Sequence, residues 1–184
     1  MRSQPPQFDR EKLKEAVWLI ASHCPGRELG NVKLHKMLYF SDMLYFLREG
    51  RPITGVEYLK QQFGPTARHL TAAIAGLQQD GKLRVEEHEY YGYYKKQYVS
   101  LLPYVPERLT ADEQALILDV ADFVRGHTAQ EISELSHNAA WEAAELGEAL
   151  PYFTALRLLP DELTDDDRTW AIDSARQYAH TPAG

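Results

Sequence analysis

The segment EISELSHNAAW holds residue types that could carry out nucleophilic catalysis, because Ser133 and Ser136 stand close to His137. A serine nucleophile with a histidine base also needs a group that orients the base and donors for the developing oxyanion. The sequence provides no signature for either. Ser133 and His137 are four residues apart near the end of a predicted helix, where a cationic histidine interacts favourably with the helix dipole. We therefore interpret the segment as a structural turn that could contact a partner.

Other catalytic and ligand-binding signatures are missing from the sequence. It contains neither a G-x-x-x-x-G-K phosphate loop nor a G-x-S-x-G nucleophile elbow. The seven histidines occur singly, without the spacing of a zinc site. Cys24 follows His23 directly, and adjacent residues of a helix point in different directions, which disfavours a Cys–His dyad. The sequence predicts a protein that is not an enzyme and has no cofactor or metal.

Composition predicts one folded domain with an uneven charge distribution. The 184 residues are 44% hydrophobic and 26% charged, which is ordinary for a globular protein. Residues 1–108 carry 16 Lys and Arg against 12 Asp and Glu, whereas residues 109–184 carry four Arg, no Lys and 15 Asp and Glu. An acidic half repels nucleic acid and attracts basic partners. The alternative interpretation is a solvated surface that only aids solubility.

Cysteine use and hydropathy point to a cytoplasmic protein. Cys24 is the one cysteine of the sequence and so has no internal disulfide partner, which fits a reducing compartment. Charged residues interrupt the apolar stretches before they reach the length of a membrane span. Residues 1–8 include Pro5 and Pro6 and lack the apolar core of a secretory signal. We expect a cytoplasmic protein without a membrane segment.

The N-terminal part of the chain predicts two helices. Asp9 can cap a first helix, in which apolar residues recur at helical spacing. Asn31 can cap a second helix, which runs to about Glu49 and ends at Gly50. This second helix is apolar around most of its circumference, so we expect it to be buried on several sides. A carboxylate such as Asp42 within it must be solvated or paired.

The middle of the chain predicts a short helix followed by a β-hairpin. Gly64 and Pro65 form a turn signal, and Thr66 is the predicted N-cap of a helix that reaches residue 79. The segments KLRVEEHEY and KKQYVSL then alternate in the manner of two half-buried antiparallel strands around Gly92. The order of helix, short element, helix and two-stranded hairpin is that of a winged helix.

The C-terminal part predicts further helices. Thr110 with Glu113, and Thr128 with Glu131, have the spacing of capping boxes. A short alanine-rich helix follows, and an acidic helix is expected at residues 164–180. The predicted fold class is mainly α with a small antiparallel β-hairpin or sheet (α+β), in which a helical bundle surrounds a buried central helix and includes a winged-helix-like segment.

Four motifs occur in order along the chain. They are KLHKMLYFSD at residues 33–42, RPITG at residues 51–55, Tyr58 followed by FGP at residues 63–65, and ELSH at residues 134–137 with Trp141. This set resembles the Panacea domain of the SocA-like antitoxin family. The resemblance predicts a Panacea domain at residues 9–150, with residues 151–184 as an acidic helical extension packed on the same domain.

The resemblance implies a non-catalytic antitoxin that neutralises a cognate toxin by protein–protein contact. The toxin would be encoded by the adjacent gene of a two-gene locus in a bacterium, phage or mobile genetic element. SocA itself acts as an adaptor that hands its toxin to a protease, and this is the mechanistic alternative. The family-motif residues would be either scaffold or partner contacts: Lys33, Tyr39, Asp42, Gly64, Pro65, His137 and Trp141.

Tyrosines gather around the turn of the predicted hairpin. A domain that serves many toxins would place specificity on variable surface, and tyrosine offers a large, rigid contact area at low entropic cost. Successive strand residues point to opposite faces, so these side chains cannot all be core. The candidate toxin contacts are Tyr90, Tyr91, Tyr93 and Tyr94. The alternative is that at least half of the tyrosines pack on the protein's own helices.

The winged-helix-like order also raises the alternative of a DNA-binding transcriptional regulator. Arg68 is the one Lys or Arg within the predicted recognition helix at residues 66–79, and Arg84, Lys95 and Lys96 lie on the hairpin. Neutralisation of phosphates supplies most non-specific affinity for DNA, and the protein as a whole is acidic. DNA binding is therefore the second hypothesis, which could coexist with toxin binding in a protein that represses its own operon.

Overall fold

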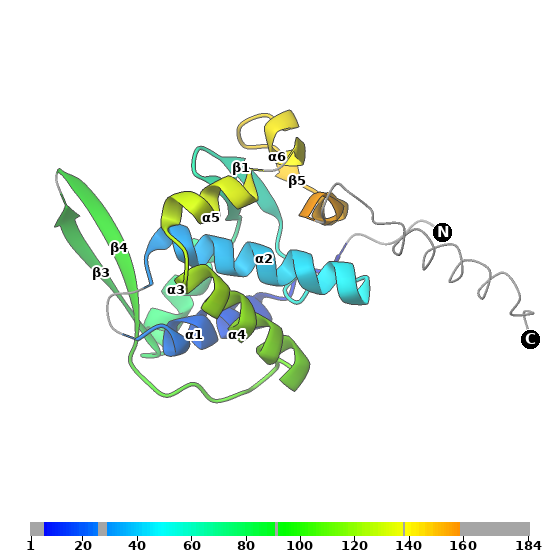
Figure 1. The fold of residues 1–184 in the computed structure, drawn as a ribbon. Helices are drawn as coiled ribbons and strands as arrows, with labels where there is room; N and C mark the ends of the chain where they lie inside the picture. The colour runs from blue at the N-terminus through cyan, green and yellow to red at the C-terminus, as the bar shows by residue number, and fades with distance from the viewer. Residues whose placement is uncertain (1–5, 26–28, 91, 138, 159–184) are drawn as a thin grey trace, which may run out of the picture.

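The computed structural model describes residues 6–25, 29–90, 92–137 and 139–158 (Figure 1). The helices of this part are α1 (Arg10–His23), α2 (Asn31–Glu49), α3 (Leu70–Gln79), α4 (Ala111–Arg125), α5 (Ala129–Ser136) and α6 (Ala139–Ala143). The strands are β1 (Tyr58–Gln61), β2 (Gly64–Ala67), β3 (Leu83–Tyr90), β4 (Tyr93–Ser100) and β5 (Ala149–Leu150), and the 3-10 helix η1 (Tyr152–Leu158) follows them. This mainly α fold with small antiparallel sheets confirms the predicted fold class.

Helix α2 is the central element of the fold. It contacts α1, α4, α5, β2 and η1, and Figure 1 shows it running through the middle of the molecule. Its buried positions include polar residues, among them Lys36 and Asp42. The helix ends at Gly50 as predicted, with the left-handed φ of 69° that favours glycine at a helix C-terminus. The prediction of a buried central helix is confirmed.

The predicted cap of α2 is wrong by one residue. Gly30 is the N-cap, and Asn31 is the first residue of the helix. The side chain of Asn31 is engaged elsewhere, since its Oδ1 accepts a hydrogen bond of 2.6 Å from the Tyr98 hydroxyl on β4. A tertiary contact has therefore replaced the local cap that the sequence indicated. At α1, Asp9 caps as predicted and accepts from the amides of Glu11 and Lys12.

A three-stranded antiparallel sheet in the order β2-β1-β5 is the main feature that the sequence prediction lacks. Tyr58 of β1 pairs with Ala67 of β2 on one side and with Leu150 of β5 on the other. The residues predicted to form a turn and a helix cap at 64–66 are strand residues instead, and His69 holds the N-cap position of α3. Pro65 is tolerated in a strand here because β2 lies at the edge of the sheet.

Strands β3 and β4 form the predicted antiparallel hairpin, which projects from the helical body (Figure 1). Its register pairs Leu83 with Ser100 at the base and Tyr90 with Tyr93 at the tip. The base packs on α1, α2 and α3, and the Tyr98 amide donates to the Leu29 carbonyl at 3.1 Å. The order of α2, β1–β2, α3 and the hairpin is the winged-helix-like order that the sequence predicts.

Both predicted capping boxes are present. Thr110 caps α4 and Thr128 caps α5, and in each the glutamate three residues later returns a bond to the cap backbone. The expected acidic helix at residues 164–180 and Tyr91 lie outside the described residues. No helix within the described part of the chain is long and apolar enough to cross a membrane.

Candidate functional site

Asp42 lies buried in α2 and is surrounded by hydrogen-bond donors. Its carboxylate accepts bonds from the Thr54 amide at 2.7 Å, the Thr54 hydroxyl at 2.5 Å and the Tyr58 hydroxyl at 2.8 Å. Burial raises the pKa of Asp42, and the hydrogen bonds from Thr54 and Tyr58 oppose that rise. The carboxylate therefore fastens the loop after α2 and the first residue of β1 to the central helix.

Aromatic side chains close off this carboxylate from solvent. Tyr39 meets Tyr58 edge-on with ring centroids 5.3 Å apart, and Tyr152 of η1 completes the group. The Tyr152 hydroxyl donates to the Val56 carbonyl at 2.6 Å. Tyr39 and Asp42 are each only 1% exposed. The side chains of these two motif residues therefore lie in the core and not on the surface of the domain.

Lys36 forms a second polar network on α2. Its side chain is fully buried, and its ammonium donates to the Phe63 carbonyl at 2.7 Å and to Ser136 Oγ at 2.7 Å. The Ser136 hydroxyl in turn donates a hydrogen bond to the Ser133 carbonyl at 2.8 Å. Within the described part of the chain, no carboxylate pairs with Lys36, and burial lowers the pKa of its ammonium to about 7.

Gly64 lies directly against the Lys36 ammonium. Its φ of 105° favours glycine, and a Cβ at this position would overlap the Lys36 ammonium and lie 2.9 Å from Ser136 Oγ. Pro65, the next residue, is buried in β2. In the FGP motif, Phe63 therefore supplies the carbonyl that accepts from Lys36, and Gly64 leaves room for the ammonium. Pro65 begins the part of the edge strand that follows.

His137 and Trp141 form a stacked pair beside this network. Their ring centroids are 3.8 Å apart and their planes differ by 8°. The Lys60 ammonium lies 4.2 Å from the centroid of the Trp141 ring and donates to the Ala144 carbonyl at 2.9 Å. Burial lowers the pKa of His137, and the neighbouring Lys36 lowers it further. The pair ties the segment after α5 to β1.

Three of the four sequence motifs therefore meet around one buried lysine, although 91 residues lie between the end of the first motif and the start of the last. A family model described as Antitoxin SocA-like, Panacea domain, matches residues 34–142. The chain belongs to this antitoxin family. No curated protein and no solved structure matches the chain.

The remaining candidate residues of this Panacea domain lie on its periphery. Lys33 donates from its ammonium to the Arg125 carbonyl at 3.3 Å and so links α2 to the end of α4. Tyr94, on the hairpin, is 74% exposed, whereas Tyr98 on the same strand is buried. Tyr90 and Tyr93 pair across the tip, but their side chains, like Tyr91, lie outside the described residues. Tyr94 is thus the one candidate contact side chain that the structure places on the surface.

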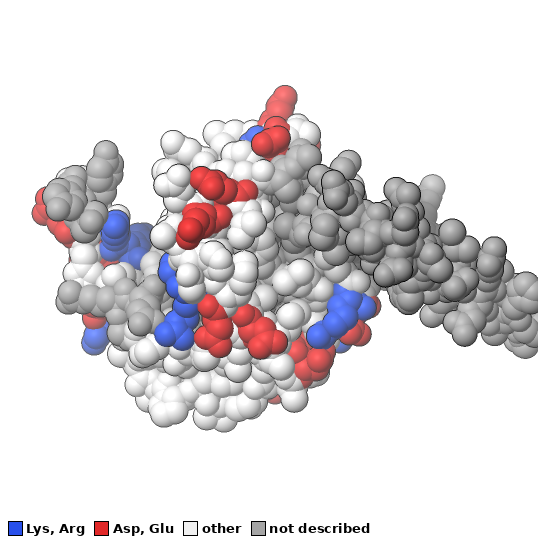
Figure 2. Space-filling model, in the orientation of Figure 1, with Lys and Arg blue, Asp and Glu red and all other residues white. Residues whose placement is uncertain are grey.

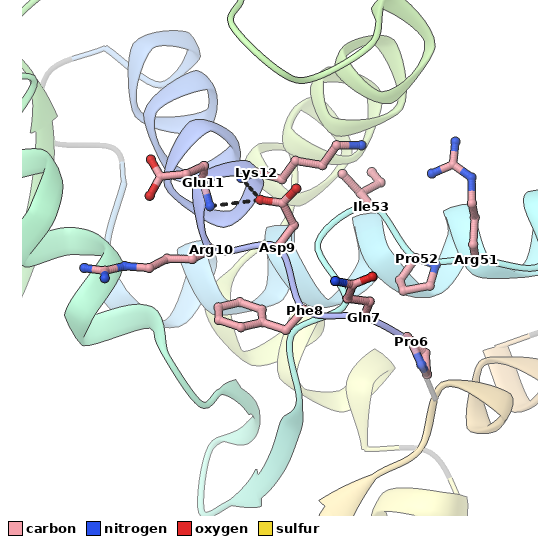
Figure 3. A pocket seen from close by; sticks show the side chains of 10 residues that line it. All are labelled: Pro6, Gln7, Phe8, Asp9, Arg10, Glu11, Lys12, Arg51, Pro52 and Ile53. Carbon is pink, nitrogen blue, oxygen red and sulfur yellow. Dashed lines mark hydrogen bonds between the residues drawn. The ribbon is translucent and has the colours of Figure 1, made fainter. Parts of the chain in front are cut away.

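An open pocket of about 520 Å³ lies at the start of α1 (Figure 3). It is lined by residues 6–12 and 51–53, and three of its charged groups form contacts within the fold. Asp9 caps α1, while Lys12 and Arg51 reach the buried Glu113 carboxylate at 2.6 and 3.2 Å. Within the described residues, no group of three or more histidine, cysteine or acidic side chains could hold a metal ion.

Sequence reasoning missed several residues that define the surface and the lysine network. Lys36 belongs to a recognised motif, but nothing local indicates that its ammonium is buried rather than solvated. From the sequence, Ser136 is interpreted as part of a structural turn that could contact a partner, not as a hydrogen-bond partner of a buried lysine. Phe63 and Leu146 are 67% and 71% exposed, on turns that flank β1 and β5. Only the missed three-stranded sheet brings these two turns together, so no sequence signal could have paired them.

Proposed function

We propose that this protein is an antitoxin that neutralises a cognate toxin by binding it directly. The observation that carries the proposal is membership of the SocA-like antitoxin family over residues 34–142. The buried polar residues support a role in binding rather than catalysis, because Asp42 and Lys36 are both sealed inside the domain and bonded to groups of the same chain. A catalytic group must instead be reachable by its substrate.

The proposal includes a domain organisation and a contact. Residues 9–150 form the antitoxin domain, and residues 151–184 form an extension that packs on it. The buried Tyr152, which bonds to Val56, supports this for the beginning of the extension. The hairpin tip around Tyr94 contacts the toxin, because an exposed tyrosine on a projecting hairpin offers area to a partner at little cost in entropy.

The DNA-binding alternative gains no support from the surface charges. Helix α3 carries no Lys or Arg, and Arg68 just before it pairs with Glu57 at 2.5 Å. On the hairpin, Arg84 pairs with Glu86 at 2.7 Å and Lys96 lies 3.7 Å from Glu87. Cations that are already paired offer less to phosphates.

A growth-rescue experiment tests the function. The neighbouring gene is expressed alone, and then together with this protein, in a host that lacks both. We expect the neighbour to arrest growth and this protein to restore it while the two co-purify as a stable complex. A harmless neighbour, or rescue without a complex, would overturn direct neutralisation. Rescue that disappears when host proteases are deleted, with the toxin no longer depleted, would instead identify a proteolytic adaptor.

A further inference from the structure

An acidic surface covers α5, α6 and the turn before β5, and the one cation that the described residues place on it, the Lys60 ammonium, bonds to backbone carbonyls there. Between Arg125 and Arg157 the chain contains five glutamates and no Lys or Arg. All five are exposed, and Figure 2 shows acidic side chains over α5 and α6. Within the described residues none of them forms an ion pair, whereas acids elsewhere, such as Asp80 and Asp122, do. This surface therefore keeps its negative charge available to a partner.

Large apolar side chains stand exposed among these glutamates. Phe63 is 67% exposed on the turn between β1 and β2, and Leu146 is 71% exposed on the turn before β5. The two turns are adjacent, because the Gly147 amide donates to the Lys60 carbonyl at 2.8 Å. Leu135 of α5, 49% exposed, directly precedes the Ser136 that shares Lys36 with Phe63.

The backbone beneath this surface is held in place. The Phe63 carbonyl and the Ser136 hydroxyl are both fixed by the buried Lys36 ammonium, and the Lys60 ammonium bonds to the Ala144 carbonyl. A surface whose backbone is already ordered loses little conformational entropy when a partner binds. Exposed apolar groups surrounded by charge are typical of protein interaction sites.

We infer that this acidic apolar face is the docking surface for a basic, amphipathic segment of the toxin. The face is defined by Phe63, Leu135, Leu146, Glu134, Glu142 and Glu145. The apolar side chains of the segment would cover Phe63 and Leu146, and its Lys or Arg side chains would meet the glutamates. This inference rests on the proposed function, and it places the main contact away from the hairpin tip.

Charge decides between a toxin segment and other occupants. Residues 159–184 of the chain itself carry six Asp and Glu against two Arg, so the face would repel them. A second copy of the chain has a net charge of −7 and is likewise disfavoured. A basic toxin segment is the occupant whose charge complements the face.

The full-length protein and the purified product of the neighbouring gene provide the test. Two double variants alter the face: Phe63→Ser with Leu146→Ser, and Glu134→Lys with Glu145→Lys. The control, Glu49→Lys with Asp119→Lys, makes the same change in charge at exposed positions on α2 and α4. Thermal unfolding checks that each variant is folded. We expect each face variant to bind the toxin at least about tenfold more weakly and to lose growth rescue, and the control to match the wild type.

The outcomes separate the inference from the proposed function. If the wild-type protein neither binds the toxin nor rescues growth, the proposed function fails. If the wild type rescues and the folded face variants bind as tightly as the control, the inference is overturned while the function stands. If light scattering finds a wild-type dimer that the face variants dissolve, with toxin affinity unchanged, the face joins two copies of the chain and the inference is also overturned.

Discussion

Lys36 and Ser136 are one hundred residues apart in the chain, and a hydrogen bond of 2.7 Å joins the ammonium of the first to the hydroxyl of the second. The same ammonium donates to the Phe63 carbonyl. One buried cation on α2 therefore holds both the β1–β2 turn and the end of α5. Breaking these bonds loosens exposed side chains on two separate elements, which connects the interior of the domain to its acidic apolar face.

Gly64→Ala will destabilise the protein strongly. The added Cβ would displace the Lys36 ammonium, and the residue would keep a φ of 105°. We expect the free energy of unfolding to fall by about 2–4 kcal/mol, measured by urea denaturation. Gly92→Ala is the matched control, since Gly92 also has a positive φ, of 81°, but nothing lies within 4 Å of its Cβ position. It should cost only about 1–2 kcal/mol, and equal losses for the two variants would contradict the role of Lys36.

The stability of the protein will rise with pH between about 7 and 9. Unfolded Lys36 holds its proton up to its ordinary pKa of 10.5, whereas in the folded protein burial lowers that pKa to about 7. The unfolded state thus binds more protons across this window, so the free energy of unfolding increases by up to about 1 kcal/mol per pH unit. Tyr98 and Tyr104, whose pKa values burial raises, act in the opposite sense only near pH 10.

Lys36→Met isolates the contribution of this lysine. Methionine fills a similar volume and carries no titratable group, so the pH slope should become nearly flat. The variant also leaves the Phe63 carbonyl without its hydrogen-bond donor. The quantity to compare is therefore the pH dependence of the free energy of unfolding, not its absolute value. Urea denaturation at several pH values gives the slopes. An unchanged slope in Lys36→Met would show that another group titrates.

The elements that sequence reasoning predicted well are those with local signals. The capping boxes at Thr110 and Thr128 and the alternation of the β3–β4 hairpin depend on residues a few positions apart. The strand β2 was missed because its existence depends on β1, and a Gly-Pro pair read alone indicates a turn. The same limit applies to the buried polar site, whose contacts join residues that are far apart in the sequence. Asp42 was expected to need partners, but its donors Thr54 and Tyr58 could be assigned only from the fold.

Asp42→Asn will destabilise the domain although the side chain keeps its shape. Both carboxylate oxygens accept bonds from donors of Thr54 and Tyr58, and an amide group must turn its own donor toward one of them. We expect a loss of about 2–4 kcal/mol in the free energy of unfolding. Asp119→Asn, at an exposed position on α4, should change it by less than about 0.5 kcal/mol. Similar values for both variants would argue against a structural role for Asp42.

Tyr94→Ala tests the hairpin contact separately from the acidic apolar face. Tyr94 is 74% exposed, so its removal should leave the thermal midpoint unchanged. If the tip contacts the toxin, titration calorimetry will find affinity reduced about tenfold. Phe123→Ala, which removes an exposed aromatic ring from α4, is the control and should bind like the wild type. Wild-type affinity in Tyr94→Ala would remove the hairpin tip from the interface.

Association with the toxin will slow as salt concentration rises. Residues 109–184 carry 15 acidic side chains against four Arg, and a field of this sign steers a basic partner over distances that salt screens. Stopped-flow mixing should give an association rate constant that falls about tenfold from about 0.05 to about 0.5 M salt. Glu134→Gln with Glu145→Gln should reduce this slope more than Glu49→Gln with Asp119→Asn, because only the first pair lies on the docking face. A rate constant that stays flat in the wild type would exclude electrostatic steering, and equal slopes in the two variants would place the steering charges elsewhere.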